Sequence, residues 1–111
     1  MRHAPLFASV AAVSVFLSAT ALAEVDKKTE RLWKAQCAAC HGQGGKGDTE
    51  KGKQMKVQDM TTAAWQAKKD DALKSAITNG VKSAGGNMDA FKDLTPDQVN
   101  ALVAYMRTFK P

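Results

Sequence analysis

The feature that most constrains this chain is a five-residue sequence, Cys37-Ala38-Ala39-Cys40-His41, which contains both of its cysteines. Because only two residues separate the cysteines, a disulfide would close a very small loop and would stabilise the fold little. A thioredoxin-like redox pair would need a βαβ setting, and no strand-like alternation of apolar and polar residues is present. Structural zinc needs four ligands, whereas this segment provides three: two cysteines and one histidine.

The histidine that follows the second cysteine indicates a different chemistry. Cys-x-x-Cys-His is the attachment sequence of c-type haem. In a helical turn this spacing brings both sulfurs to one side, where they can reach the two vinyl groups on one porphyrin edge. The small side chains of Ala38 and Ala39 leave room for the ring. We therefore expect one haem c, bound covalently through Cys37 and Cys40, with His41 as the proximal iron ligand.

The first 23 residues have the three zones of a secretory signal peptide. A short positive start precedes an apolar stretch over residues 6–17, and the segment ends in Ala21-Leu22-Ala23, an A-x-A cleavage pattern. A retained membrane anchor is the alternative, because residues 4–23 carry no charge and about 20 apolar residues cross a bilayer. The serines and the cleavage pattern favour removal. We expect export to a bacterial periplasm, where haem is attached, and a mature domain of residues 24–111 that does not insert into a membrane.

The middle of the chain predicts short helices between glycine-rich loops. Asp26 can cap a helix that runs to about Ala38. Thr61 or Thr62 can open a short helix through Lys68. A third helix opens at residue 70 or 71 and ends at Asn79-Gly80, a left-handed termination signal.

The last helix has the clearest start. In Thr95-Pro96-Asp97-Gln98, Thr95 can cap, Pro96 suits the first turn, and Gln98 completes a capping box. Residues 42–52 and 85–87 are rich in glycine and predict loops. The fold class is therefore all-α, with four or five short helices.

These features together resemble a class I monohaem c-type cytochrome, and the likeness covers nearly all of residues 24–111. Leu32-Trp33 lies just before the first cysteine, Met88 lies in a loop before the last helix, and Tyr105 lies near the end of that helix. The resemblance implies the cytochrome c fold, wrapped around one covalent haem, with Trp33 packed near Tyr105. Thr29 departs from the pattern, because the family often has glycine there.

The sixth iron ligand is expected to be Met88. His41 is the only histidine of residues 24–111, and thioether sulfur suits an electron-transfer haem. Each methionine can instead be a core residue, and the candidates are Met55, Met60, Met88 and Met106. Met88 follows two glycines far enough along the chain to reach the other face of the haem. The family usually has proline after this methionine, whereas this chain has Asp89.

The haem is also expected to complete a small hydrophobic core. A domain of this length buries little apolar surface and usually needs a staple. The apolar residues expected to pack around the haem are Leu32, Trp33, Leu73, Ile77, Phe91, Leu94, Leu102 and Val103.

The charge of the chain bears on its partners. The formal net charge is +5, and four lysines fall close together: Lys46, Lys51, Lys53 and Lys56. They can steer an acidic docking surface of a redox partner, or they can form a merely solvated surface. The two propionates of a haem would lower the charge, so nucleic-acid binding is not implied.

Three functions fit these residues. The first is a monomeric, soluble, exported one-electron carrier between donor and acceptor redox proteins. The second is a haem subunit of a dehydrogenase or oxidase complex. The third is a haem sensor or haem enzyme with an open sixth position. No paired carboxylates, nucleophile–base pair or phosphate-binding loop is recognisable, so the sequence favours an electron-transfer protein over an enzyme.

Overall fold

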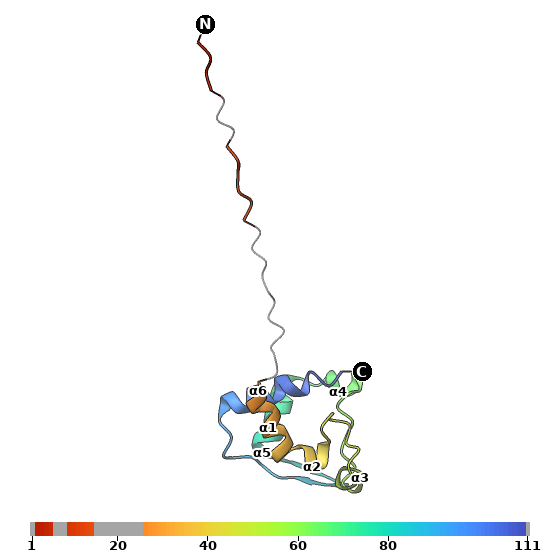
Figure 1. Cartoon of the computed structure of the whole chain (residues 1–111). Helices are drawn as coiled ribbons and strands as arrows, with labels where there is room; N and C mark the ends of the chain where they lie inside the picture. The colour runs from red at the N-terminus through yellow and green to blue at the C-terminus, as the bar shows by residue number, and fades with distance from the viewer. Residues whose placement is uncertain (1, 6–8, 15–25, 111) are drawn as a thin grey trace.

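A computed structural model describes residues 2–5, 9–14 and 26–110 of the chain. Most of the predicted signal peptide, including the cleavage pattern at residues 21–23, lies outside the described residues. The rest folds into short helices and one small hairpin (Figure 1). The elements are α1 (Lys27–Gln36), α2 (Ala38–His41), α3 (Glu50–Gln54), α4 (Ala63–Gln66), α5 (Asp70–Asn79), β1 (Val81–Ser83), β2 (Gly86–Met88) and α6 (Pro96–Met106).

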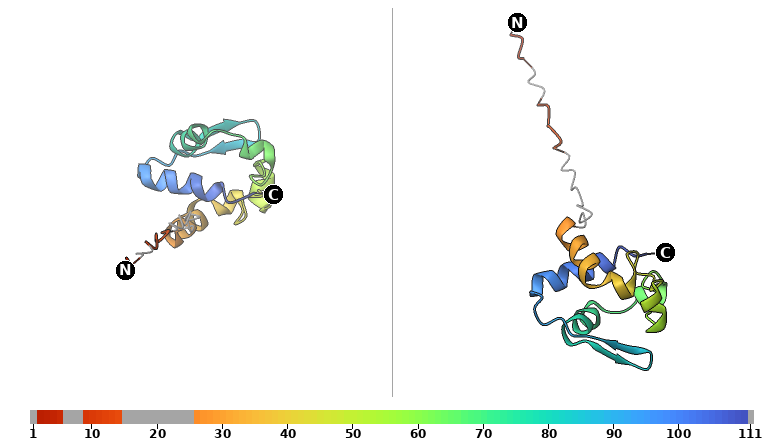
Figure 2. Two further views of the ribbon diagram at one scale, coloured as in Figure 1. Left: turned by 90° about the horizontal axis from the view of Figure 1, so that it is seen from above. Right: turned by 60° about the horizontal axis from the view of Figure 1, so that its bottom comes forward.

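The first and last helices pack against each other, as Figure 2 shows. Asp26 caps α1 by accepting from the backbone N–H of Lys28 at 3.1 Å. Thr95 and Gln98 form the predicted capping box at the start of α6. The rings of Trp33 and Tyr105 meet edge to face with centroids 5.5 Å apart, so the expected aromatic contact between these helices is confirmed. Such pairs contribute beyond the area they bury.

The core lies between α1, α5, α6 and the segment around α4. Trp33 and Leu102 are its most deeply buried large side chains, each 1% exposed. The other buried apolar residues are Met60, Trp65, Leu73, Ile77, Val99, Val103 and Met106. The remaining predicted core residues pack partly buried against this cluster: Leu32, Phe91 and Leu94.

Two elements differ from the sequence expectation. Residues 50–54 form α3, which begins within the predicted loop of residues 42–52 and continues past its end, because Thr49 caps a helical turn there. Residues 81–88 form an antiparallel hairpin, in which Val81 pairs with Met88. Since its strands are only three residues long, they carry too little alternation to be recognised in the sequence. The all-α class is otherwise confirmed. The described residues form six helices where the sequence predicts four or five, and two of them, α2 and α4, are single turns.

In the part of the chain that the structure describes, no helix is long and apolar enough to cross a membrane.

Candidate haem-binding site

The Cys-x-x-Cys-His sequence occupies one helical turn that begins where α1 ends. Cys37 is the C-cap residue of α1, and its N–H donates to the carbonyl oxygen of Trp33 at 2.8 Å. The N–H of His41 then donates to the carbonyl oxygen of Cys37 at 3.0 Å, which closes the turn of α2. Residues three and four apart on a helix lie on one face. The turn therefore presents Cys37, Cys40 and His41 on the same side.

Both cysteines are half-buried free thiols in this structure. Burial, and secondarily the charge of Cys40, raises the pKa of the Cys37 thiol to about 11. Cys37 is therefore protonated at neutral pH, because its environment disfavours a thiolate. A neutral thioether suits this half-buried position better than an ionised thiolate does.

His41 has the properties of a metal ligand. Burial lowers the pKa of its imidazole, which favours the neutral form that binds metals. Its Nδ1 atom is buried and has no hydrogen-bond partner among the described residues. Buried polar atoms are normally paired, so this ring nitrogen marks an unsatisfied polar site beside the cysteines. Two free thiols and a neutral, half-buried imidazole are the donor set that a covalent haem requires.

Trp33 supports the segment that follows His41. Its indole Nε1 donates to the carbonyl oxygen of Gly42 at 3.1 Å, and its ring centroid lies 6.0 Å from that of His41. The ring of Phe109 covers Trp33 from the C-terminal end of the chain, with centroids 5.2 Å apart. Gly45 has no room for a side chain, because the ring of Phe109 lies against it. Aromatic packing thus fixes the chain on both sides of the motif.

Thr49 is a site residue that the sequence interpretation missed. Its hydroxyl lies 2.8 Å from the carbonyl oxygen of Ala39 and 3.1 Å from that of Cys40, and it accepts from the N–H of Gly52 at 2.9 Å. One side chain therefore satisfies the end of α2 and the start of α3. The signal in the sequence is a threonine followed by Glu50, a usual start of a helix.

The four methionines considered as iron ligands occupy different environments. Met60 and Met106 are buried in the core, each 5% exposed. Met55 is half-buried at the end of α3, and its side chain lies against the hairpin near Gly86. Met88 is half-buried in β2 and packs against the core cluster. Met88 thus reaches the core from β2, a different element from the α2 turn that carries the Cys-x-x-Cys-His sequence.

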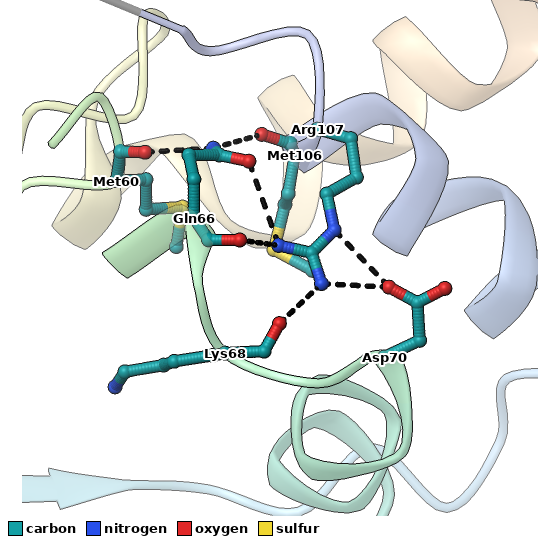
Figure 3. Close-up of polar contacts among 6 residues, drawn as sticks. All are labelled: Met60, Gln66, Lys68, Asp70, Met106 and Arg107. Carbon is teal, nitrogen blue, oxygen red and sulfur yellow. Dashed lines mark hydrogen bonds and ion pairs between the residues drawn. The ribbon is translucent and has the colours of Figure 1, made fainter. Parts of the chain in front are cut away.

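A polar cluster that sequence patterns do not indicate fixes the segment before α5 to the end of α6 (Figure 3). The side-chain amide of Gln66 donates to the carbonyl oxygens of Met60 at 2.8 Å and Met106 at 3.0 Å, and a third bond reaches Phe109. The guanidinium of Arg107 donates to the carbonyl oxygen of Gln66 at 2.9 Å and to the carboxylate of Asp70 at 2.7 Å. Partners about 40 positions apart leave no local signal in a sequence.

Comparison with known proteins gives one family. Residues 24–106 match the model of the family described as cytochrome c oxidase, cbb3-type, subunit III. The chain is 37% identical over 84 residues to the cbb3-type cytochrome c oxidase subunit FixP of Azorhizobium caulinodans. This alignment covers 74% of this chain and 26% of that protein. It is 33% identical over 89 residues to the cbb3-type cytochrome c oxidase subunit CcoP of Helicobacter pylori, and that alignment covers 78% of this chain and 28% of that protein. The chain therefore spans about a quarter of the length of these relatives.

A solved structure gives the same result. The KustC0563 c-type cytochrome superposes with a TM-score of 0.66 at 32% identity, covering 75% of this chain and 98% of that one. The family carries covalently bound haem c, and its cytochrome domains transfer electrons. The chain therefore belongs to the cytochrome c family of cbb3-type oxidase subunit III, and it is a monohaem c-type cytochrome.

Proposed function

We propose that this domain is a haem-carrying component of a cbb3-type oxidase and passes one electron at a time toward it. In this proposal Cys37 and Cys40 would hold the haem through thioethers, and His41 and Met88 would bind its iron. The observation that carries the proposal is the turn of α2, which places two free thiols and a neutral imidazole on one face in a chain related to FixP and CcoP.

The haem supplies an iron that alternates between the ferrous and ferric states. The residues of the chain keep its surroundings constant during that change. The hydrogen bonds of Thr49 and Trp33 hold α2 and the residue after His41 in place. Met88 is carried by a hairpin strand. If His41 and Met88 both stay bound to the iron, little would have to rearrange on electron transfer, and His/Met ligation would raise the potential.

The lysines are proposed to guide an acidic partner surface to the haem edge. Lys46, Lys51, Lys53 and Lys56 are all exposed, and they lie in or next to α3. Because Thr49 bonds α3 to the end of α2, this basic surface lies beside the cysteine-bearing turn. Complementary charge mainly accelerates association and is screened by salt.

A diffusible carrier is the second candidate. The observation that favours it is the KustC0563 c-type cytochrome, a solved chain of which 98% is covered by this one. The two candidates share the haem site and differ in the permanence of the partner. In both, residues 1–23 are proposed to be a removed signal peptide, and residues 24–111 a periplasmic electron-transfer domain.

The proposed function is tested with the exported, haem-loaded protein and a purified cbb3-type oxidase. The ferrous protein should be reoxidised by the oxidase in air, and the oxidase should remain bound to it through size-exclusion chromatography. Reoxidation without stable association would favour the diffusible carrier, and no reoxidation would contradict the oxidase role. Rapid stoichiometric carbon monoxide binding by the ferrous protein would instead indicate an open-site haem sensor.

Processing is tested separately by intact mass. We expect a periplasmic species that begins at Glu24 and carries one haem. A membrane-bound species that retains residues 1–23 would show that the segment is an anchor.

A further inference from the structure

The base of the hairpin that carries Met88 is fixed to α5. Gly80 ends α5 with φ +76°, and a Cβ atom built there would lie 2.6 Å from the carbonyl oxygen of Met88. Beyond the hairpin, the N–H of Phe91 donates to the carbonyl oxygen of Ile77 at 2.9 Å. The chain on both sides of the hairpin is therefore held against the end of one helix.

The tip of the hairpin touches a different element, the end of α3. A Cβ atom at Gly85 would lie 2.7 Å from the carbonyl oxygen of Met55 and 3.0 Å from Cβ of Lys56. A Cβ atom at Gly86 would lie 3.0 Å from Cε of Met55. The two glycines therefore let the backbone of the tip pass directly over Met55 and Lys56. The hairpin extends from α5 to α3 in the views of Figures 1 and 2.

The end of α3 has an unusual backbone at this contact. Lys56 has φ 53°, the left-handed conformation that residues other than glycine rarely adopt. The turn is bonded on both sides, since the N–H of Lys56 donates to Lys53 at 3.3 Å and that of Val57 donates to Gly52 at 2.9 Å. Surrounding structure must hold such a conformation in place. Here it places Met55 and Lys56 against the hairpin tip.

The hairpin depends on such contacts for its order. Two strands of three residues each are marginal in isolation, because a lone hairpin buries too little surface. Asp89, which follows Met88, is exposed and does not restrict the backbone as a proline would. Met88 lies two residues from Gly86, between the base on α5 and the tip on α3. Its position is thus set by contacts at both ends of the hairpin.

We propose that Met55 and Lys56 form a latch, defined as their packing contact with Gly85 and Gly86. This latch keeps Met88 in place as the sixth iron ligand. The inference rests on the proposed function, which assigns that ligand to Met88. Met55 is then a positioning residue that acts through the hairpin. Opening the latch should raise the fraction of time that Met88 is detached while leaving the cysteine-bearing turn intact.

The principal test compares two glycine substitutions in the full-length, haem-loaded protein. Gly85→Ala places a methyl group against the Met55 backbone, whereas Gly44→Ala is a matched control, since a Cβ atom there meets nothing within 4 Å. We expect Gly85→Ala to weaken the red absorption band of sulfur-ligated ferric haem and to speed carbon monoxide binding by the ferrous protein about tenfold. Amide exchange at residues 86–88 should accelerate in parallel, and Gly44→Ala should behave as wild type.

A second pair of variants keeps the test decisive where Gly85→Ala does not fold. Met55→Ala removes the side chain that rests on Gly86 and should show the same changes to a smaller extent. Met55→Leu should restore the wild-type band and rate, because leucine fills a similar volume and cannot bind iron. The latch is wrong if every one of the variants Gly85→Ala and Met55→Ala that folds binds carbon monoxide at the wild-type rate.

Met88→Ala separates the failure of the latch from the failure of the proposed ligand. If Met88→Ala abolishes the sulfur band while the latch variants behave as wild type, only the latch is wrong. If the band survives Met88→Ala and is lost in both Met55→Ala and Met55→Leu, Met55 is the ligand and both proposals fall.

Discussion

The indole N–H of Trp33 donates to the carbonyl oxygen of Gly42, which joins the middle of α1 to the residue directly after His41. Trp33→Phe would keep an aromatic ring in the core but leave this buried carbonyl unpaired. An unsatisfied buried group costs about 1–3 kcal/mol. We expect the unfolding temperature of the ferric protein to fall by about 4–8 °C for each kcal/mol lost, measured by circular dichroism. Tyr105→Phe, which keeps the ring of the partner helix, should change it far less.

Replacing the proposed sixth ligand should change the haem and not the fold. Met88→Ala should abolish the sulfur–iron absorption band and lower the reduction potential, because His/Met ligation raises that potential. Spectroelectrochemistry measures both. Met60→Leu is the control, since Met60 is a buried core residue and leucine preserves its packing. Loss of the band in Met60→Leu alone would identify Met60 as the ligand.

The bonds of Arg107 to backbone carbonyls should matter more than its ion pair. The carboxylate side chain of Asp70 is 61% exposed, and exposed ion pairs contribute about 0–1 kcal/mol. The bond from Arg107 to the carbonyl of Gln66 is partly buried, and bonds to charged groups contribute about 1.5–3 kcal/mol. Chemical denaturation should therefore show a larger loss for Arg107→Ala than for Asp70→Asn. Equal losses would show that the ion pair dominates.

The basic surface beside α2 should set the rate of encounter with an acidic partner. Lys51→Glu combined with Lys53→Glu should lower the second-order rate of electron exchange more than it changes dissociation. The wild-type rate should also fall with added salt, since charges are screened over about 8 Å at physiological ionic strength. Lys27→Glu with Lys28→Glu makes the same charge change at the start of α1. A stopped-flow rate that responds equally to both pairs would indicate net charge and not a local surface.

Loss of the haem should unfold most of the domain. A chain of this size has few buried apolar residues, and the haem adds a large apolar surface to that core. Cys37→Ala with Cys40→Ala should yield little holoprotein, and the exported chain should show weak helical circular dichroism and rapid proteolysis. A stably folded, haem-free double variant would show that the side chains alone suffice.

Features with a local signal could be predicted from the sequence. The Cys-x-x-Cys-His turn, the Asp26 cap and the Thr95 capping box each follow from residues within four positions of one another. The contact of Trp33 with Tyr105 joins distant positions, and it was predicted only because the chain resembles a known family. The assignment of Met88 as a ligand stays a prediction.

Features that depend on distant partners could not be predicted. Gln66 bonds to carbonyl groups up to 43 positions away, and nothing near it in the sequence indicates that role. Gly85 and Gly86 indicated a flexible loop, yet the structure uses them for close contact with Met55. Glycine permits both outcomes, because it lacks a side chain, and only the neighbouring segment decides between them.

Phe109 limits how far this chain can be shortened at its C-terminal end and where a tag can be joined to it. Its ring rests on Trp33 and covers Gly45, and its carbonyl oxygen accepts a bond from Gln66. A truncation before this residue would expose the indole that supports the haem turn to solvent. An affinity tag or fusion partner is therefore best joined beyond Lys110, through a linker that leaves the aromatic ring seated.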